Sequence, residues 1–340
     1  MSATLVDAEA VDAWIGDRLP TGAFSIERSS TGASNEMFEV RRGEQVWILR
    51  RPPLHKVAPG AHDMAREFRV LTALEGTEVP HPSPVLLCED EAVIGAPFYL
   101  MERIDGFTPR DPLPAPFDVD GGSRREMAFA LIDGIAAVAR VDWRARGLEG
   151  FGKPDGFLER QVSRWLSQLA RYRTRDIPGL DEVAGWLQAN RPVMGKPAII
   201  HGDYQFINVM LAPEPPARLA AIVDWEQSTI GDPLLDLAWV LAGWSEDGEA
   251  LRFGSKYLTD RRGFPSRREL ADRYEQQTGR DLTRLPWYVV LALFKLACIL
   301  EGSYHRFVTG NSDNPLHEKM GPLVLDLARQ AQETARSGVI

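Results

Sequence analysis

Two short apolar runs in the middle of the chain, at residues 198–200 and 219–223, each lead into an aspartate. Runs of this length that stop at turn residues are typical of short buried strands. The first run leads into a loop that holds Asp203 and Asn208, and the second ends directly at Asp224. We expect two hairpin-like strand pairs here, which would bring these three polar side chains to one edge.

Two acids and an amide in this arrangement suit phosphoryl transfer. One carboxylate must orient the attacking hydroxyl and accept its proton, a role that we assign to Asp203. Hard oxygen ligands must hold Mg²⁺ on the nucleotide phosphates, and Asn208 and Asp224 supply an amide oxygen and a carboxylate. An aspartate after a strand is more often a turn or capping residue. A metal-hydrolase site at His201 would need a second histidine at ligand spacing, which the sequence lacks.

The order of these residues resembles the catalytic segment of kinase-like enzymes. The HGD triplet that ends in Asp203 stands where protein kinases have HRD, and the DWE triplet that begins with Asp224 stands where they have DFG. With the GDPLLDLA segment at 231–238, the set closely resembles the aminoglycoside phosphotransferase and choline-kinase-like family. The resemblance implies ATP as the donor, with GTP as the alternative, Mg²⁺ as the metal and a small-molecule hydroxyl as the acceptor. It further implies catalytic roles for His201 and Asp203 and metal ligation by Asn208 and Asp224.

Asp236 lies inside the start of an apolar helical segment. We interpret it as a buried acid that bonds the backbone of the catalytic loop without taking part in the chemistry. The alternative is a plain acid at a helix N-terminus, where the helix dipole favours negative charge.

The first hundred residues predict an antiparallel sheet with one main helix. Apolar runs bounded by turn residues indicate strands, and helical spacing indicates helices. We expect strands at 24–28, 36–41, 45–50, 85–88 and 97–102, and helices at 5–19 and 61–74. This part of the chain resembles the nucleotide-binding lobe of kinases.

The small-residue turn at 29–35 lies between the first two of these strands. Small side chains let the backbone approach a ligand closely, so main-chain N–H groups in this turn can cover nucleotide phosphates. We assign phosphate contacts to Ser30, Gly32, Ser34 and Asn35. An ordinary hairpin turn is the alternative.

Arg50, at the end of the third strand, stands where kinases carry a basic residue that contacts the phosphates and pairs with a helix glutamate. Glu67 is its natural partner. The usual residue is lysine; arginine keeps the charge but presents a planar fork. Lys56 is the second candidate for the phosphate contact, and a surface ion pair of little energetic importance is the alternative.

Residues 101–106 occupy the place of the hinge between lobes, where Glu102 and Ile104 would bond the adenine edge through their backbones. A Pro-rich loop follows, which cannot form a helix or a central strand and therefore marks a boundary between lobes at 1–103 and 107–340. Helices are expected in the second lobe at 123–141, 157–172, 180–190, 234–243, 249–258, 266–278, 285–307 and 317–335. The predicted fold is α+β, protein-kinase-like and two-lobed, with a larger, mostly helical C-terminal lobe.

Bulk properties limit the partners and the compartment. The net charge of −9 argues against nucleic acid or an anionic membrane as the main partner. Cys88 and Cys298 are the only cysteines, which suits a reducing cytoplasm. The N-terminus shows no secretory signal. The apolar stretch at 285–300 is too short and too polar for a membrane span and predicts a core helix.

Four segments resemble one narrower branch of this family: LRRPP, AHDMAREFRVL, VPHPSPVLLCED and GAPFYLMERIDG. They resemble the phosphotransferase-like domains that occur alone in bacteria or fused ahead of acyl-CoA dehydrogenase domains. In that branch an arginine at the Arg50 position is common. The branch suggests hydroxyacyl-CoA compounds as acceptors.

The acceptor classes differ in charge. Aminoglycosides are polycations and would need an acidic pocket, for which Glu246, Asp247 and Glu249 are candidates, although a solvated loop is the simpler interpretation. A hydroxyacyl-CoA would need basic groups for its phosphates. The candidates for these are Arg261, Arg262, Arg267 and Arg268. A nucleotide-binding pseudokinase without turnover is the alternative from another class of protein.

Overall fold

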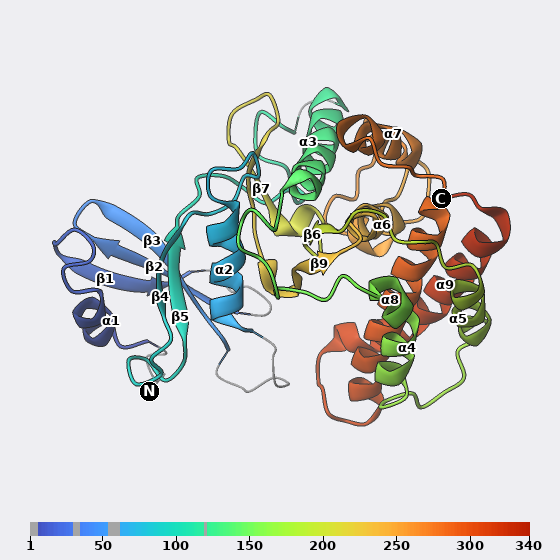
Figure 1. The fold of residues 1–340 in the computed structure, drawn as a ribbon, viewed down its shortest axis with the longest axis horizontal. Coiled ribbons are helices and arrows are strands. Elements are labelled where there is room, and N and C mark those ends of the chain that lie inside the picture. The colour runs from blue at the N-terminus through green and yellow to red at the C-terminus, as the bar shows by residue number, and fades with distance from the viewer. Residues whose placement is uncertain (1–5, 30–34, 54–61, 119–120) are drawn as a thin grey trace.

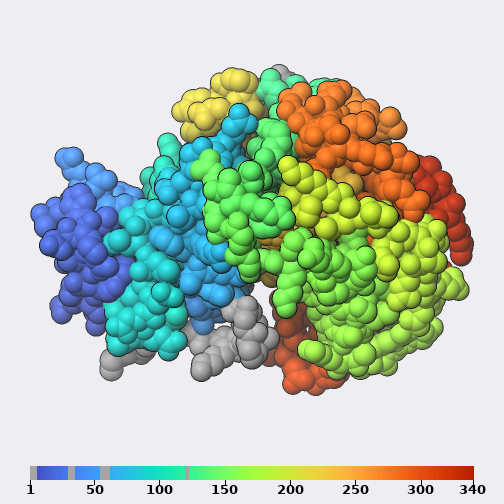
Figure 2. Space-filling model, viewed as in Figure 1, coloured from blue at the N-terminus to red at the C-terminus, as the bar shows by residue number. Residues whose placement is uncertain are grey.

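A five-stranded antiparallel sheet forms the N-terminal lobe of the computed structural model, which describes residues 6–29, 35–53, 62–118 and 121–340 (Figure 1). The strand order is β1-β2-β3-β5-β4. The bounds are β1 Phe24–Arg28, β2 Glu36–Arg42, β3 Gln45–Arg51, β4 Pro84–Cys88 and β5 Phe98–Glu102. All five predicted strands are confirmed, and Figure 2 shows this blue-to-cyan lobe beside the larger C-terminal lobe.

The pleat of β3 sorts its residues between the two faces of this sheet. Trp47 and Leu49 belong to a buried cluster that includes Val11 and Ile15 of helix α1 (Ala8–Ile15). Arg50 lies on the opposite face, with Ile48, and is directed toward helix α2. A period of two along the strand therefore turns Arg50 toward the C-terminal lobe.

Helix α2 (Met64–Leu74) presents an acid on its buried face. Asp63 caps the helix by accepting a hydrogen bond from the backbone N–H of Arg66 at 3.0 Å. Met64, Glu67, Val70, Leu71 and Leu74 are buried, at the spacing of one helix face. Glu67 thus faces the sheet at the level of Arg50.

The C-terminal lobe is mainly helical, as predicted. Its helices are α3 Gly121–Arg140, α4 Phe157–Leu169, α5 Leu180–Ala189, α6 Leu234–Ala242, α7 Arg267–Thr278, α8 Leu285–Val308 and α9 Pro315–Ser337. The expected helix at 249–258 is wrong: only the 3₁₀ turn η3 (Phe253–Ser255) forms there. Gly254 packs on Gly243 so closely that a Cβ on Gly254 would lie 3.0 Å from the Gly243 carbonyl oxygen. Close backbone contact therefore replaces helix in this segment.

Four short strands border the cleft between the lobes. They are β6 Ala198–Ile200, β7 Val209–Leu211, β8 Leu219–Ile222 and β9 Thr229–Gly231. The hairpin of β7 with β8 is as predicted, but β6 pairs with β9 instead of forming a hairpin of its own. All three residues of β6 are buried, so its backbone needs a partner, and β9 brings the end of the Asp224 loop back beside the catalytic loop.

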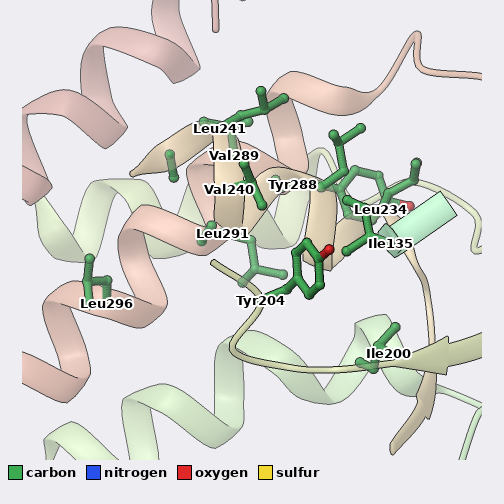
Figure 3. Packing of buried hydrophobic residues seen from close by; sticks show 14 of the residues in the cluster. Ile135, Ile200, Tyr204, Leu234, Val240, Leu241, Tyr288, Val289, Leu291 and Leu296 are labelled. Carbon is green, nitrogen blue, oxygen red and sulfur yellow. The ribbon is translucent and has the colours of Figure 1, made fainter. Parts of the chain in front are cut away.

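Helix α8 is long and apolar enough to cross a membrane by length and composition, but 78% of its most apolar window is buried inside the protein. It packs against α4, α6 and α9. The predicted core helix is therefore confirmed, whereas the expectation that this stretch is too short and too polar for a membrane span is wrong on length and composition. Figure 3 shows part of this core around Tyr204, whose hydroxyl donates to the carbonyl of Leu131 at 2.7 Å.

Candidate active site

The catalytic loop begins where β6 ends, and one buried acid bonds its backbone. Asp236, in the first turn of α6, accepts hydrogen bonds from the backbone N–H groups of His201 at 2.6 Å and Gly202 at 2.8 Å. Burial raises the pKa of Asp236, and the two N–H donors oppose that rise. The predicted contact of Asp236 with the catalytic-loop backbone is confirmed.

Glycine is the only residue type that fits at position 202 of this turn. Its φ is +87°, in the left-handed region, and a Cβ would lie 2.6 Å from the carbonyl oxygen of Gln227. The glycine of the HGD triplet therefore allows the chain to turn sharply just before Asp203.

His201 is fully buried, and both of its ring nitrogens contact backbone groups. Its Nε2 lies 2.9 Å from the carbonyl oxygen of Val223, and its Nδ1 accepts from the backbone N–H of Asp203 at 3.3 Å. Its ring packs against Trp225 with a centroid distance of 4.9 Å. The imidazole thus joins the Asp203 loop to the residue before Asp224, a contact that positions both acids.

Asp203 is a half-buried carboxylate with three side-chain donors. Its Oδ1 accepts from Gln205 Nε2 at 2.9 Å and from Trp239 Nε1 at 3.0 Å. Its Oδ2 accepts from Asn208 Nδ2 at 3.0 Å. Since each bond favours one orientation of the carboxylate, the side chain is fixed before any ligand arrives. Trp239 was not predicted as a partner of Asp203, because it lies 36 residues further along the chain, on α6.

Asn208 and Asp224 are neighbours through the backbone. The carbonyl of Asn208 accepts from the N–H of Val223 at 2.9 Å. The amide of Asn208 donates to the Asp203 backbone and side chain, so its Oδ1 points elsewhere and has no hydrogen-bond partner among the described residues. Asp224 adopts a left-handed conformation, with φ 67° and ψ 60°, and 25% of its side chain is exposed.

This pair fits a magnesium ion that a nucleotide shares. One carboxylate and one amide oxygen do not fill an octahedral shell, and no group of three His, Cys, Asp or Glu residues within the described ranges could hold a metal by itself. Magnesium usually completes its shell with phosphate oxygens and water. Asn208 and Asp224 are therefore suitable ligands only with a nucleotide present.

Arg50 joins the two lobes. Its Nε lies 2.9 Å from Glu67 Oε2, and its Nη2 donates to Asp224 Oδ1 at 2.5 Å. Arg50 and Glu67 are only 6% and 2% exposed, so the predicted pair is buried and is not a surface ion pair. Burial raises the pKa of Glu67 to about 7, although Arg50 and the hydroxyl of Tyr99, at 3.0 Å, lower it.

A second acid that the sequence did not single out lies beside this network. Glu226, the last residue of the DWE triplet, accepts from Asn35 Nδ2 at 3.1 Å and lies 3.2 Å from His62 Nδ1. Asn35 is buried. The other predicted turn residues Ser30, Gly32 and Ser34, and also Lys56, lie outside the described residues.

The two predicted hinge residues differ in their contacts. Glu102 is exposed, its N–H donates to the carbonyl of Ser83 at 2.8 Å, and its carboxylate accepts from the Ser83 N–H at 3.2 Å. Neither main-chain group of Ile104 has a hydrogen-bond partner in the described part of the chain. Phe107 then pairs with Leu211 in both directions, at 2.8 and 2.9 Å, which ties the hinge to β7.

A cavity of about 870 Å³ is lined by Gly202, which precedes Asp203, and by residues of both lobes. Trp239, which bonds Asp203, forms part of its wall, together with Lys295 of α8. Lys295 Nζ donates to the carbonyl of Gly202 at 2.9 Å and lies 4.2 Å from the Trp239 ring centroid. Burial lowers the pKa of Lys295, and Asp203 and Asp236 oppose that shift.

The acidic and basic candidates for acceptor binding do not line this cavity. Glu249 is bound by Arg267 at 2.7 Å, and Glu246 accepts from the Arg267 backbone at 2.8 Å. The remaining arginine candidates are also engaged elsewhere. Arg261 stacks on Trp244 and Phe264, Arg262 pairs with Asp260, and Arg268 pairs with Asp272. The residues that do surround the cavity come from distant segments, and local patterns could not group them.

Comparison with known proteins gives one consistent family. Residues 25–287 match the model of the phosphotransferase enzyme family. Acyl-CoA dehydrogenase family member 11 of Gallus gallus is 34% identical over 323 residues, which cover 93% of this chain and 41% of that protein. The chain thus spans about two fifths of the length of this curated relative.

Solved structures agree with this result. A candidate aminoglycoside phosphotransferase from Ralstonia eutropha has a TM-score of 0.82 and 31% identity, over 97% of this chain and 98% of its own. An aminoglycoside phosphotransferase in a ternary complex with ADP and hygromycin B has a TM-score of 0.59 and 14% identity, over 93% of this chain and 95% of its own. The second likeness concerns the fold alone.

Proposed function

The chain belongs to the phosphotransferase enzyme family, and from this premise we propose that it transfers the terminal phosphate of ATP to a hydroxyl group of a small molecule. The observation that carries the proposal is the convergence of Asp203, Asn208 and Asp224. Asn208 donates to Asp203 through its side chain and accepts through its backbone from Val223, the residue before Asp224. Two acids and an amide joined in this way suit metal-dependent phosphoryl transfer.

In the proposed reaction Asp203 orients the acceptor hydroxyl. The hydroxyl oxygen attacks the terminal phosphorus, the bond from that phosphorus to ADP breaks, and the hydroxyl proton passes to Asp203. Gln205 and Trp239 bond one oxygen of this carboxylate and Asn208 bonds the other, so the side chain needs little reorganisation. His201 acts as a positioning residue, since it is buried and contacts the backbone on both sides of the site.

The donor nucleotide would lie between the lobes. Asn208 and Asp224 would hold Mg²⁺, which neutralises charge on the phosphates when it is bound. Arg50, next to Asp224, is the cation best placed to contact the same phosphates. The backbone groups of Ile104, which have no hydrogen-bond partner among the described residues, are available to a purine edge, and adenine and guanine are the alternatives there.

The relatives suggest two classes of acceptor. The solved relatives include aminoglycoside phosphotransferases, and the curated relatives are acyl-CoA dehydrogenase family members, which suggests hydroxyacyl-CoA compounds as the second candidate. Two of the three acidic residues proposed for a polycation, Glu246 and Glu249, bond Arg267, and none of the three lines the cavity, which disfavours an aminoglycoside. A pseudokinase without turnover is disfavoured because Asp203, Asn208 and Asp224 are all retained and lie together.

A phosphate-transfer screen tests this function. Labelled ATP and Mg²⁺ are incubated with the protein and a panel of aminoglycosides, amino alcohols, sugars and hydroxyacyl-CoA compounds. We expect phosphate transfer to at least one alcohol of the panel. The substitution Asp203→Ala should lower the rate of this transfer by a factor of about 10² to 10⁴, while nucleotide binding is retained. Asp313→Ala, the same change at an exposed position between α8 and α9, is the matched control. Equal rates in wild type and Asp203→Ala would remove Asp203 from its role.

A further inference from the structure

The cavity beside Asp203 is basic in a protein that is acidic as a whole. Its wall carries five basic side chains and two carboxylates, although the net charge of the chain is −9. The basic side chains are Arg66, Lys153, Arg160, Arg164 and Lys295. Both carboxylates are already used: Asp236 bonds the catalytic loop, and Glu226 lies against His62.

None of these five side chains forms an ion pair with a residue that the structure describes. Within the described ranges, no carboxylate lies within 4.0 Å of any of them, whereas other arginines of the C-terminal lobe, such as Arg124, Arg175, Arg267 and Arg273, are paired with an acid. Like charges that converge without counterions repel one another, and a concave wall adds to the local field. Such a cluster is stabilised when an anion enters.

We propose that this cavity binds the phosphate acceptor through a negatively charged group on that molecule. The inference rests on the proposed function, because it takes the alcohol next to Asp203 as the acceptor. It specifies the class of acceptor: an alcohol with an apolar body and an anionic group.

Helix α4 supplies the rim of this site. Arg160 and Arg164 are one turn apart on the same face of the helix, and both are exposed. Arg160 donates from Nη1 to the carbonyl of Asp155 and from Nη2 to the carbonyl of Lys153, both at 2.5 Å. Carbonyl acceptors orient the guanidinium without cancelling its charge, so Arg160 is prepared for an incoming anion.

Arg66 extends this basic wall from the N-terminal lobe. Its Nη2 donates to the carbonyls of Phe151 at 2.5 Å and Ser228 at 3.0 Å, and its guanidinium lies 3.8 Å from the Phe151 ring centroid. Here too the partners are neutral. Basic groups from both lobes therefore face one space, and an anion bound there would contact both.

Part of the cavity wall is apolar. Phe157, Trp165, Leu235, Trp239 and Leu291 contribute to its wall, and Trp239 also bonds the proposed base. An acceptor hydroxyl next to Asp203 would thus have the Trp239 ring and Lys295 nearby, with the exposed Arg160 and Arg164 further out. A polycationic sugar would meet repulsion at the rim and lose its hydration in the interior.

The test is a binding experiment without nucleotide, so that it does not depend on turnover. Isothermal titration compares 3-hydroxyoctanoate, the neutral octane-1,3-diol, kanamycin and the coenzyme A thioester of 3-hydroxyoctanoate. The acid should bind wild type at least about tenfold more tightly than the diol, the size expected for one charge-assisted hydrogen bond. The coenzyme A thioester shows which anionic group the cavity recognises. If the thioester binds more tightly than the free acid, the recognised groups are phosphates; if it binds more weakly, the recognised group is the carboxylate.

Variants locate the binding group. The double variant Arg160→Gln, Arg164→Gln should lose the tenfold preference for the anions and keep its affinity for the diol and for ATP. Arg268→Gln, an exposed arginine of α7 that pairs with Asp272, is the matched control and should bind as wild type does. Equal affinity for acid and diol, preferential binding of kanamycin, or an unchanged double variant would overturn the inference. Failure of the proposed function appears differently, as an anionic alcohol that binds but receives no phosphate.

Discussion

Asp236→Asn is the sharpest test of how the catalytic loop is held. The carboxylate accepts two backbone N–H groups, at 2.6 and 2.8 Å, and it is buried. The amide keeps one acceptor oxygen but turns its NH₂ group toward the second N–H. Each bond to a charged group contributes about 1.5–3 kcal/mol, and the substitution also removes the cost of a buried charge, so we expect a loss of roughly 2–3 kcal/mol.

The same substitution should impair turnover more than binding. Displacement of the loop by about 1 Å is enough to lower kcat by roughly 10², because Asp203 then no longer meets the acceptor hydroxyl. Urea denaturation measures the stability, and steady-state kinetics with the acceptor found in the screen measures kcat and the KM for ATP.

Asp232→Asn is a matched control in the same segment. Asp232 is also buried, but it accepts from the Tyr288 hydroxyl at 2.8 Å and the Leu234 N–H at 3.1 Å, away from the catalytic loop. It should lose stability and keep most of its kcat. An Asp236→Asn variant with wild-type kcat, or equal losses of kcat in both variants, would refute the reasoning.

Three further predictions concern the site. The pKa of Glu67 is raised from 4.5 to about 7 in the folded protein, so folding takes up a proton between these pH values. The contribution of Glu67 to the free energy of unfolding therefore falls as the pH rises from 4.5 to 7, by up to about 3 kcal/mol. The stability difference between wild type and Glu67→Gln, measured by urea denaturation at several pH values, should shrink over that window; a constant difference would contradict it. Arg50→Lys keeps a positive charge, but its ammonium cannot bond Glu67 and Asp224 together as the guanidinium does. The ATP affinity of Arg50→Lys should therefore fall by roughly tenfold, and that of Arg50→Ala should fall further. Equal ATP affinities of the two variants, measured by titration, would argue against a phosphate contact. Trp239→Phe removes one donor to Asp203 and should lower kcat roughly tenfold with little change in stability, and an unchanged kcat would exclude this contact from the mechanism.

Much of the fold could be predicted because the informative patterns are local. The period of two in β3 and the helical spacing of α2 are enough to place Arg50 opposite Glu67. The contact of Asp236 with the catalytic loop was also predicted correctly, since an acid inside an apolar helix start needs a buried donor.

The remainder depends on long-range packing. The partner of β6 is β9, and no pattern within three-residue strands identifies it. The basic cavity wall combines Arg66, Lys153, Arg164 and Lys295 from segments that are far apart in sequence, and each of them alone is an ordinary helix or loop residue. Local sequence therefore predicted that Asp203, Asn208 and Asp224 lie together, but it did not group the basic side chains of the cavity wall.

The central claim is that Asp203 and Asp224 act at one nucleotide in different roles. Isothermal titration of ATP with and without Mg²⁺, applied to Asp203→Ala and Asp224→Ala, tests it most directly. We predict that Asp224→Ala loses the magnesium-dependent part of the ATP affinity, whereas Asp203→Ala binds Mg²⁺–ATP as tightly as wild type but does not transfer phosphate. Wild-type magnesium dependence in Asp224→Ala would contradict the account.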